Sequence, residues 1–217
     1  MNRRLALLIF AALSLQAQPN FATFPLDSTA GLQPHNIKID TAKYLGRTAV
    51  HVAAGDQMDA LIIVPHTFRN GTIELEVAGK PAAGAAQAAR GFIGLAFHLA
   101  PDAARYECFY LRPTNGRADD QLRRNHSVQY VSEPDYPWNR LRDESPGKYE
   151  SYVDLEPGVW TKIRIVVAGR NAQLFVHGAA QPCLIVNDLK LGESEGLLAL
   201  WAGPGTDGYF SNLRVAK

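Results

Sequence analysis

The chain has 217 residues, of which 47% are hydrophobic, and its 22 lysines and arginines nearly balance 21 aspartates and glutamates. A formal charge of +1 argues against a nucleic-acid partner, because binding to nucleic acid usually requires a basic stripe. A chain of this size can bury a large core without metal or disulfides, so one large domain suits it better than two small ones.

Residues 1–17 have the layout of a secretory signal peptide. Arg3 and Arg4 precede an uncharged apolar run over 5–13, and small and polar residues follow up to Ala17. The run is shorter than the roughly 20 residues that span a bilayer. We therefore expect a signal peptide over 1–17 and a mature domain over 18–217 that has no membrane span and is periplasmic or secreted. The alternative is a hydrophobic N-terminal strand or a membrane anchor.

The rest of the chain has short alternating runs of apolar residues separated by Gly, Pro, Asn and Asp, which is typical of a β-sandwich or barrel. Two packed sheets would bury every second residue of each strand, such as Ile73, Leu75 and Val77. We expect strands over 36–41, 48–53, 60–64, 72–77, 91–99, 105–112, 127–131, 151–155, 161–167, 172–177, 184–186, 196–201 and 209–215.

Three segments break this pattern. The Ala- and Gly-rich stretch 79–90 predicts a mobile loop. The segments 113–125 and 132–150 are long loops that are dense in Arg, Asn, Asp and aromatic residues. Long loops in a compact domain are usually functional or disordered, and disordered segments contain few aromatic residues. We therefore expect these two loops to contribute to a functional site.

The strand expected over 105–112 carries an aromatic and a cationic side chain on one face. Phe109 and Leu111 would share the core face, whereas Tyr110 and Arg112 would share the other. A sugar binds well to this combination, because its ring stacks on an aromatic face and its hydroxyls accept hydrogen bonds from fixed donors. The alternative is an ordinary solvated sheet face.

Side chains that can engage two adjacent hydroxyls follow in the loops and in the next strand. Trp138, which lies in a loop bounded by prolines, is expected either to form a stacking platform or to pack on the sandwich as a plug. Replacing Trp138 or Arg112 by alanine is expected to weaken sugar binding while leaving the fold intact. The predicted carbohydrate-binding residues are Tyr110, Arg112, Asn115, Gln121, Arg124, His126, Gln129, Trp138 and Arg142, and the predicted partner is an oligo- or polysaccharide.

The order of these segments resembles secreted bacterial domains of the concanavalin A-like lectin/glucanase superfamily, in the branch described as laminin G-like or 3-keto-disaccharide hydrolase-like. The resemblance spans roughly 65–215. It implies an all-β, concanavalin A-like jelly-roll sandwich of two antiparallel sheets with a ligand groove on the concave side. The segments that carry it are FIGLAFHL, YECFYLRPTNGRADDQ, NHSVQYVS, the Trp-bearing loop, GVWTKIRIVVAGRNAQLFVHG and GLLALWAGPGTDGYFSNLRV.

Three functions stay open for such a domain. It could be a carbohydrate-binding domain, a glycoside hydrolase that acts on a di- or oligosaccharide, or a laminin G-like structural or protein-interaction domain. Retaining glucanases of the superfamily that it resembles usually carry the pattern Glu-x-Asp-x-x-Glu. Glu74 and Glu76 share a strand face, but the middle acid does not fit the pattern and position 79 is Gly instead of Glu. A solvent-facing strand explains this pair at least as well as catalysis does.

Other acids lie in the two long loops. Hydrolysis by two carboxylates needs them about 5–5.5 Å apart for retention or about 6.5–9.5 Å apart for inversion. Glu150 and Asp120, one from each loop, could meet over the groove, and His126 could act as a base or orienting residue near neutral pH. These three are the candidate catalytic residues.

No cofactor is expected from the sequence. Related sandwiches often hold a structural Ca²⁺, and Asp27, Asp188 and Asp207 are available, but no EF-hand spacing is present. The His and Cys spacings also predict no zinc site. We therefore expect no metal site, with a structural Ca²⁺ left open. Cys108 and Cys183 could pair in an oxidising compartment or stay as two buried thiols.

Overall fold

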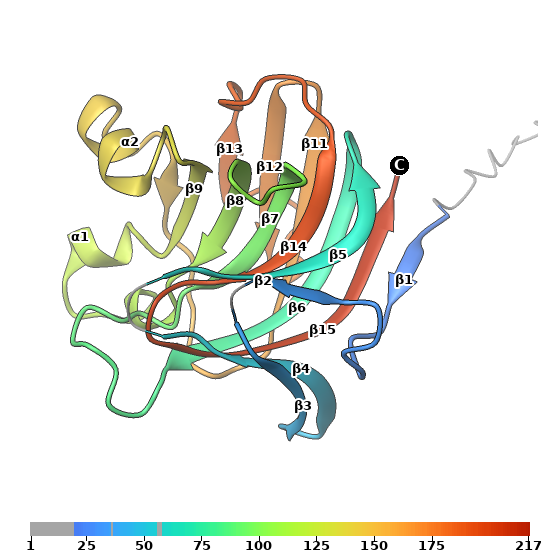
Figure 1. Cartoon of the computed structure of the whole chain (residues 1–217). Coiled ribbons are helices and arrows are strands. Elements are labelled where there is room, and N and C mark those ends of the chain that lie inside the picture. The colour runs from blue at the N-terminus through green and yellow to red at the C-terminus, as the bar shows by residue number, and fades with distance from the viewer. Residues whose placement is uncertain (1–19, 36, 56–57) are drawn as a thin grey trace, which may run out of the picture.

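The computed structural model describes residues 20–217 except 36 and 56–57, so the signal peptide expected over 1–17 lies outside the described residues. Two antiparallel sheets pack face to face (Figure 1). Sheet A has the order β13 (Leu184–Val186), β12 (Asn171–Val176), β11 (Thr161–Ala168), β6 (Gly71–Pro81), β15 (Thr206–Ala216), β4 (Arg47–Ala53) and β3 (Ile39–Tyr44), with β1 (Ala22–Phe24) paired to β15. Sheet B has the order β10 (Glu150–Ser151), β9 (Val128–Glu133), β8 (Tyr106–Leu111), β7 (Ile93–Leu99), β14 (Gly196–Ala202), β5 (Ala60–Phe68) and β2 (Gln33–His35).

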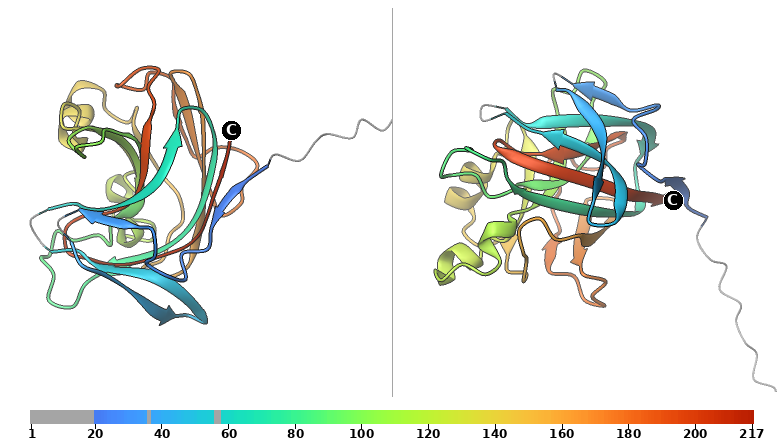
Figure 2. Two further views of the ribbon diagram at one scale, coloured as in Figure 1. Left: turned by 45° about the vertical axis from the view of Figure 1, so that its right-hand side comes forward. Right: turned by 90° about the horizontal axis from the view of Figure 1, so that it is seen from below.

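Both sheets curve around the side on which the helices lie, and sheet B forms the inner, concave side (Figure 2). The helices are short and follow the outer strands of sheet B. They are a 3₁₀ turn η1 (Pro113–Asn115), α1 (Gln121–Arg124) and α2 (Trp138–Glu144). None of the helices in the described ranges is long and apolar enough to cross a membrane.

The core between the sheets is made of alternate strand residues, as the sequence pattern predicts. Ile73, Leu75 and Val77 of β6 are each 1% exposed. Ile163 and Ile165 of the neighbouring strand β11 lie opposite Leu75 and Ile73 and are equally buried. Because strand side chains alternate in direction, one row of each strand builds this core and the other row faces outward.

A buried polar cluster also crosses the core. His98 Nδ1 lies 3.0 Å from Glu107 Oε2, and both side chains are fully buried. Glu107 Oε1 accepts hydrogen bonds from the Tyr130 hydroxyl and from the backbone N–H of Leu191, both at 2.9 Å. The Glu107 carboxylate therefore links sheet B to the segment that connects β13 and β14. It also gives the buried polar groups around it a partner, as buried polar groups usually require.

The predicted strands agree with the structure apart from the edges. The segment expected over 151–155 pairs only at Glu150–Ser151, because β10 is an edge strand with two residues opposite β9. The sequence predicted neither β1 nor β2, which have three residues each; those of β2 are all exposed and show no alternation. The two long loops contain α1 and α2, and the Asp120 side chain caps α1 by accepting a 3.0 Å hydrogen bond from Arg123 N.

Cys108 and Cys183 are both unpaired. Cys108 is buried on β8 of sheet B, whereas Cys183 precedes β13 of sheet A. The structure therefore has two free thiols, of which Cys108 is buried, as the second alternative predicts, and Cys183 is half-buried.

Glu74 and Glu76 lie on the outer face of sheet A, away from the concave side of sheet B. Glu74 pairs with Arg214 at 3.1 Å, and Glu76 pairs with Arg47 at 2.6 Å. Glu74 and Glu76 thus form salt bridges on an outward-facing strand, as the non-catalytic interpretation of the pair predicts.

Candidate functional site

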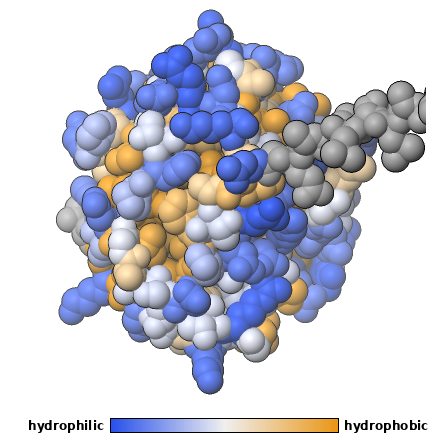
Figure 3. Space-filling view, turned by 90° about the vertical axis from the view of Figure 1, so that its right-hand side faces the viewer, coloured by the Kyte–Doolittle hydropathy of each residue, from blue (hydrophilic) through white to orange (hydrophobic). Residues whose placement is uncertain are grey.

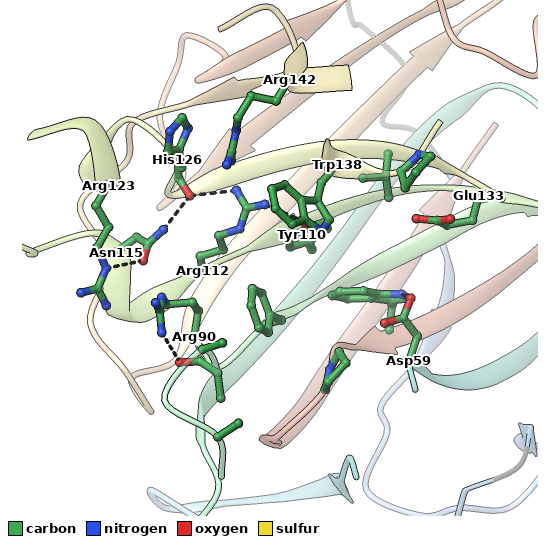
Figure 4. Close-up of a pocket in the computed structure, with 18 of the residues that line it drawn as sticks. Asp59, Arg90, Tyr110, Arg112, Asn115, Arg123, His126, Glu133, Trp138 and Arg142 are labelled. Carbon is green, nitrogen blue, oxygen red and sulfur yellow. Dashed lines mark hydrogen bonds between the residues drawn. The ribbon is translucent and has the colours of Figure 1, made fainter. Parts of the chain in front are cut away.

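A cavity of about 760 Å³ opens on the concave side of sheet B. Its floor comes from β8, β9 and β14, and its walls come from the segment 86–92, from the α1 region and from α2. Figure 4 shows the polar side chains gathered into two groups at opposite ends of the cavity. The residues that line it are Asp59, Ala86, Ala88, Ala89, Arg90, Phe92, Tyr110, Arg112, Asn115, Asp120, Leu122, Arg123, His126, Val131, Glu133, Pro137, Trp138, Arg142, Trp201 and Pro204.

The floor is aromatic. The rings of Tyr110 and Trp201 stack with centroids 4.6 Å apart, and Phe92 meets Tyr110 edge-on at 6.1 Å. Gly94 lies between Trp201 and Tyr110 in the strand register. A Cβ at Gly94 would lie 2.8 Å from Tyr110 Cβ, so this glycine lets the two rings meet across β7. The two rings cover each other, and Tyr110 and Trp201 are each only 4% exposed, so they form an apolar floor, whereas the 46% exposed ring of Trp138 offers an open stacking face.

Arg112 continues the floor and is held by four groups. It donates to the Tyr110 hydroxyl at 2.8 Å, to Gln129 Oε1 at 3.1 Å and to the His126 carbonyl at 3.1 Å. Its Nη1 also lies 3.8 Å from Glu150 Oε2. Because Arg112 is only 5% exposed, removing it would leave several buried groups unpaired. We therefore expect Arg112→Ala to lower stability as well as binding, contrary to the expectation from the sequence.

Glu150 anchors this cationic group from below. Arg142 donates to its two oxygens at 3.0 and 2.7 Å, and His126 Nδ1 lies 2.7 Å from Oε2. Burial lowers the pKa of His126, although the Glu150 carboxylate opposes this shift. The Glu150 side chain is 3% exposed and does not line the cavity. The Glu150 carboxylate therefore holds Arg112 and Arg142 in place and does not face a ligand.

Two further guanidinium groups complete the cationic end. Arg123 Nε donates to Asn115 Oδ1 at 3.0 Å, and Asn115 Nδ2 donates to the His126 carbonyl at 3.1 Å. Arg90 Nη1 donates to the carbonyls of Gln87 and Ala89 in its own loop. Figure 4 shows Arg90, Arg112 and Arg123 at the same end as Asn115.

The opposite end is acidic. Asp59 Oδ2 accepts hydrogen bonds from the Tyr106 hydroxyl at 2.9 Å and from Trp201 Nε1 at 3.2 Å. Burial raises the pKa of Asp59, although these two hydrogen bonds lower it in part. Burial also raises the pKa of Glu133, and the neighbouring Asp59 carboxylate raises it further. The two carboxyl groups are therefore close enough to influence each other's protonation.

The structure brings most of the predicted site residues to this cavity. Tyr110, Arg112, Asn115, His126, Trp138, Arg142 and Asp120 line it. Phe109 packs instead against Phe97 and Tyr130 in the core, so the predicted alternation along β8 is correct. Trp138 is 46% exposed, and Arg142 lies over its ring at 4.8 Å.

Other predicted residues lie outside the cavity. Gln121 is exposed on α1 and bonds Asn125, while Arg124 lies over the Tyr152 ring at 5.9 Å. Gln129 is buried beneath the floor, where its Nε2 donates to two backbone carbonyls. Gln121 and Arg124 point away because only one side of α1 faces the cavity. Gln129 lies on the same strand face as Val131 and Glu133, and it is buried there with its Oε1 accepting a hydrogen bond from Arg112.

The paired-acid hypothesis for Glu150 and Asp120 receives no support from this geometry. Glu150 is buried in ion pairs, and Asp120 caps α1. Besides Asp120, the acids that line the cavity are Asp59 and Glu133 at the opposite end, and the sequence reasoning missed both. It also missed the floor residue Phe92 and the cationic Arg90. Trp201 lies in β14 and Phe92 directly precedes β7, but the sequence does not show that these two strands are neighbours.

The acids considered for calcium are separate in the structure. Asp207 lies 2.8 Å from His51 Nε2, and Asp188 pairs with Lys148 and Lys190 at 2.9 and 3.0 Å. Over the described ranges, no group of three or more His, Cys, Asp or Glu side chains is placed to hold a metal ion.

Comparisons with known proteins agree on the fold. No protein-family model and no curated protein matches the sequence. A carbohydrate binding module of the CBM66 type from Bacillus subtilis aligns with a TM-score of 0.57 and 13% identity over 86% of this chain and 96% of that chain.

Two further solved structures give the same picture. A protein of unknown function with a galectin-like fold from Bacillus subtilis aligns with a TM-score of 0.59 and 10% identity over 90% of this chain and 94% of that chain. A putative glycosyl hydrolase from Parabacteroides distasonis aligns with a TM-score of 0.52 and 13% identity over 87% of this chain and 89% of that chain. The chain therefore has the concanavalin A-like jelly-roll fold.

Proposed function

We propose that this protein is a carbohydrate-binding domain whose ligand occupies the cavity on sheet B. The observation that carries the proposal is that the exposed Trp138 ring and the aromatic floor line one cavity between two groups of hydrogen-bonding side chains. An apolar ring face and convergent donors and acceptors are what a sugar ring requires. Solved structures of similar fold that are described as carbohydrate-binding support the same function.

The volume also fits a short saccharide. A cavity of about 760 Å³ lies within the range of roughly 300–1,000 Å³ that is common for small-molecule sites. A millimolar dissociation constant corresponds to only about −4 kcal/mol, which one stacked ring and a few hydrogen bonds can supply. The site therefore needs no large contact area to retain a glycan.

The positions of the large exposed apolar side chains favour a ligand site in the cavity over a flat protein-interaction face of the laminin G type. They come from separate segments of the described chain, and two of them, Leu122 and Trp138, lie at the cavity. On the face beside β1, hydrophilic and hydrophobic residues are interspersed (Figure 3). The other exposed apolar side chains are Leu45, Met58, Tyr152, Val159 and Ile185.

A test of this proposal fills the cavity without removing a buried contact. Ala88 lines the cavity and is exposed, so Ala88→Trp should narrow the site while the fold remains intact. Ala83 is exposed in the same segment but does not line the cavity, so Ala83→Trp is the matched control. On a glycan array, glycans retained by the wild type should be lost by the first variant and kept by the second. Equal retention by both variants, or no retained glycan, would refute the proposal.

A second candidate function is glycoside hydrolysis, and one observation favours it. Asp59 and Glu133 line the same end of the cavity, and both have a raised pKa, which a general acid needs near neutral pH. Reducing ends released from a bound glycan by the wild type, and abolished in an Asp59→Asn, Glu133→Gln double variant, would establish turnover. Binding without release would leave the protein as a binding domain.

The proposed site of action is the periplasm or the outside of the cell, on the strength of the sequence over 1–17. Expression in a bacterial host and N-terminal sequencing of the protein recovered from the periplasm would test it. A new N-terminus near residue 18 is expected, whereas a full-length cytoplasmic product would contradict it.

A further inference from the structure

The cationic end of the cavity has more positive than negative charge. Two carboxylates, those of Asp120 and Glu150, lie among four guanidinium groups, so two positive charges are unbalanced. Glu150 is already shared between Arg112 and Arg142. The Asp120 carboxylate accepts from the backbone N–H of Arg123 at the start of α1, so the guanidinium groups of Arg90 and Arg123 have no carboxylate partner in the described part of the chain.

Arg90 and Arg123 have hydrogen-bond donors available for an anionic ligand. Within the described residues, neither has a carboxylate at ion-pair distance. An arginine side chain has five N–H donors. Arg123 uses one of them on Asn115, and Arg90 uses its Nη1 on two carbonyls of its own loop. Several donors on each side chain thus remain for a ligand.

The arginines also repel one another. Burial lowers the pKa of Arg90, and the nearby guanidinium groups of Arg123 and Arg112 lower it further. Three like charges in a partly enclosed site raise the free energy of the empty cavity, since the dielectric screening there is weaker than in water. An anion placed among them removes this repulsion and gains charge-assisted hydrogen bonds.

We propose that the cavity selects a sugar that carries a carboxylate or sulfate group, with the anionic group bound between Arg90 and Arg123 and the sugar ring stacked on Trp138. This inference rests on the proposed carbohydrate-binding function and names the class of sugar. Asp59 and Glu133 at the far end offer no cationic partner to a second anionic group. The cavity thereby fixes the direction of the ligand, with its charge at one end and hydroxyl groups at the other.

The test uses matched pairs of oligosaccharides that differ only in charge. One set contains short galacturonate, glucuronate, mannuronate and guluronate oligomers with their neutral methyl esters. A second set contains sulfated galactose oligomers with their desulfated forms, and it distinguishes sulfate from carboxylate. Inorganic sulfate and a hexaglutamate peptide test whether the anionic group alone is enough. Titration calorimetry at low and high salt gives the dissociation constants, because a charge-dependent contact weakens as salt increases.

Three variants of the purified protein go through the same titrations. Arg90→Gln and Arg123→Gln remove one charge each from half-buried side chains at the cavity. Arg170→Gln removes a charge from an exposed arginine in the β11–β12 turn and is the matched control. Melting curves of all three confirm folding.

The charged member of at least one pair should bind the wild type about tenfold or more tightly than its neutral partner. That preference should fall by about the same factor in each cavity variant and persist in Arg170→Gln. Equal or better binding of the neutral partners would overturn the inference and leave the proposed function standing. Binding of no glycan at all would overturn both. Equally tight, arginine-dependent binding of sulfate or hexaglutamate would show an anion site that does not select a sugar.

Discussion

Replacing Trp138 tests whether the open side of the cavity contributes a stacking surface. Its ring is 46% exposed. A tryptophan side chain offers about 250 Å² of surface, so roughly 115 Å² of Trp138 is accessible to a ligand. A sugar ring that covers about half of this area would gain ~1.4 kcal/mol at ~25 cal/mol per Å². Trp138→Ala should therefore raise the dissociation constant about tenfold.

The fold should tolerate this change. The ring contacts made by Trp138 are with the guanidinium groups of Arg142 at 4.8 Å and Arg112 at 6.0 Å. Exposed contacts of this kind contribute about 0.5–1 kcal/mol, so the melting temperature should fall by only a few degrees.

The matched control is Tyr152→Ala. Tyr152 is 45% exposed and lies under Arg124, but it does not line the cavity. Titration calorimetry with any glycan that the wild type binds should show weakening in the Trp138 variant alone. An unchanged constant for Trp138→Ala, or equal weakening in both variants, would refute the stacking role.

Three other predictions concern stability. Burial raises the pKa of Asp59, so the folded chain keeps this proton to a higher pH than the unfolded chain, and stability falls as the pH rises above about 4. Asp59→Asn should therefore raise the melting temperature at pH 7 but not at pH 3. A lower melting temperature of this variant at pH 7 would contradict the prediction. Burial raises the pKa of Asp188, but hydrogen bonds from a tyrosine and two lysines outweigh it and hold the pKa at about 2. The stabilisation that the ionised Asp188 carboxylate gives the fold is therefore present above about pH 4 and is lost toward pH 2. Asp188→Asn should lower the free energy of unfolding at pH 7 by about 1 kcal/mol after solvent screening, and by much less at pH 2. Glu107→Ala leaves the Tyr130 hydroxyl, the Leu191 N–H and His98 Nδ1 without their partner, and it should lower the free energy of unfolding by about 3–5 kcal/mol in urea titration. A shift below about 1 kcal/mol would show that this cluster does not stabilise the core.

Much of the fold follows from local patterns in the sequence. Alternation along β6 and β11 predicts which side chains are buried, because successive strand residues point to opposite faces. The same rule places Tyr110 and Arg112 opposite Phe109 and Leu111 on β8. These statements need no knowledge of neighbouring strands, and the structure confirms them.

The composition of the site depends on which strands become neighbours. Trp201 and Tyr110 are far apart in sequence and meet because β14 and β8 both pair with β7. Asp59 and Glu133 come to one end of the cavity in the same way. Such pairings depend on long-range register, which no local pattern encodes.

Tertiary structure also decides which polar residues are available to a ligand. Glu150 and Gln129 look like equally good site residues in sequence, yet both are buried beneath the floor and hold Arg112 and Arg142. The sequence by itself determined a β-sandwich and the direction of each side chain along its strand, because alternation is local. Only the folded chain decided which charges neutralise one another and which, like those of Arg90 and Arg123, stay free, because that depends on distances between segments remote in sequence.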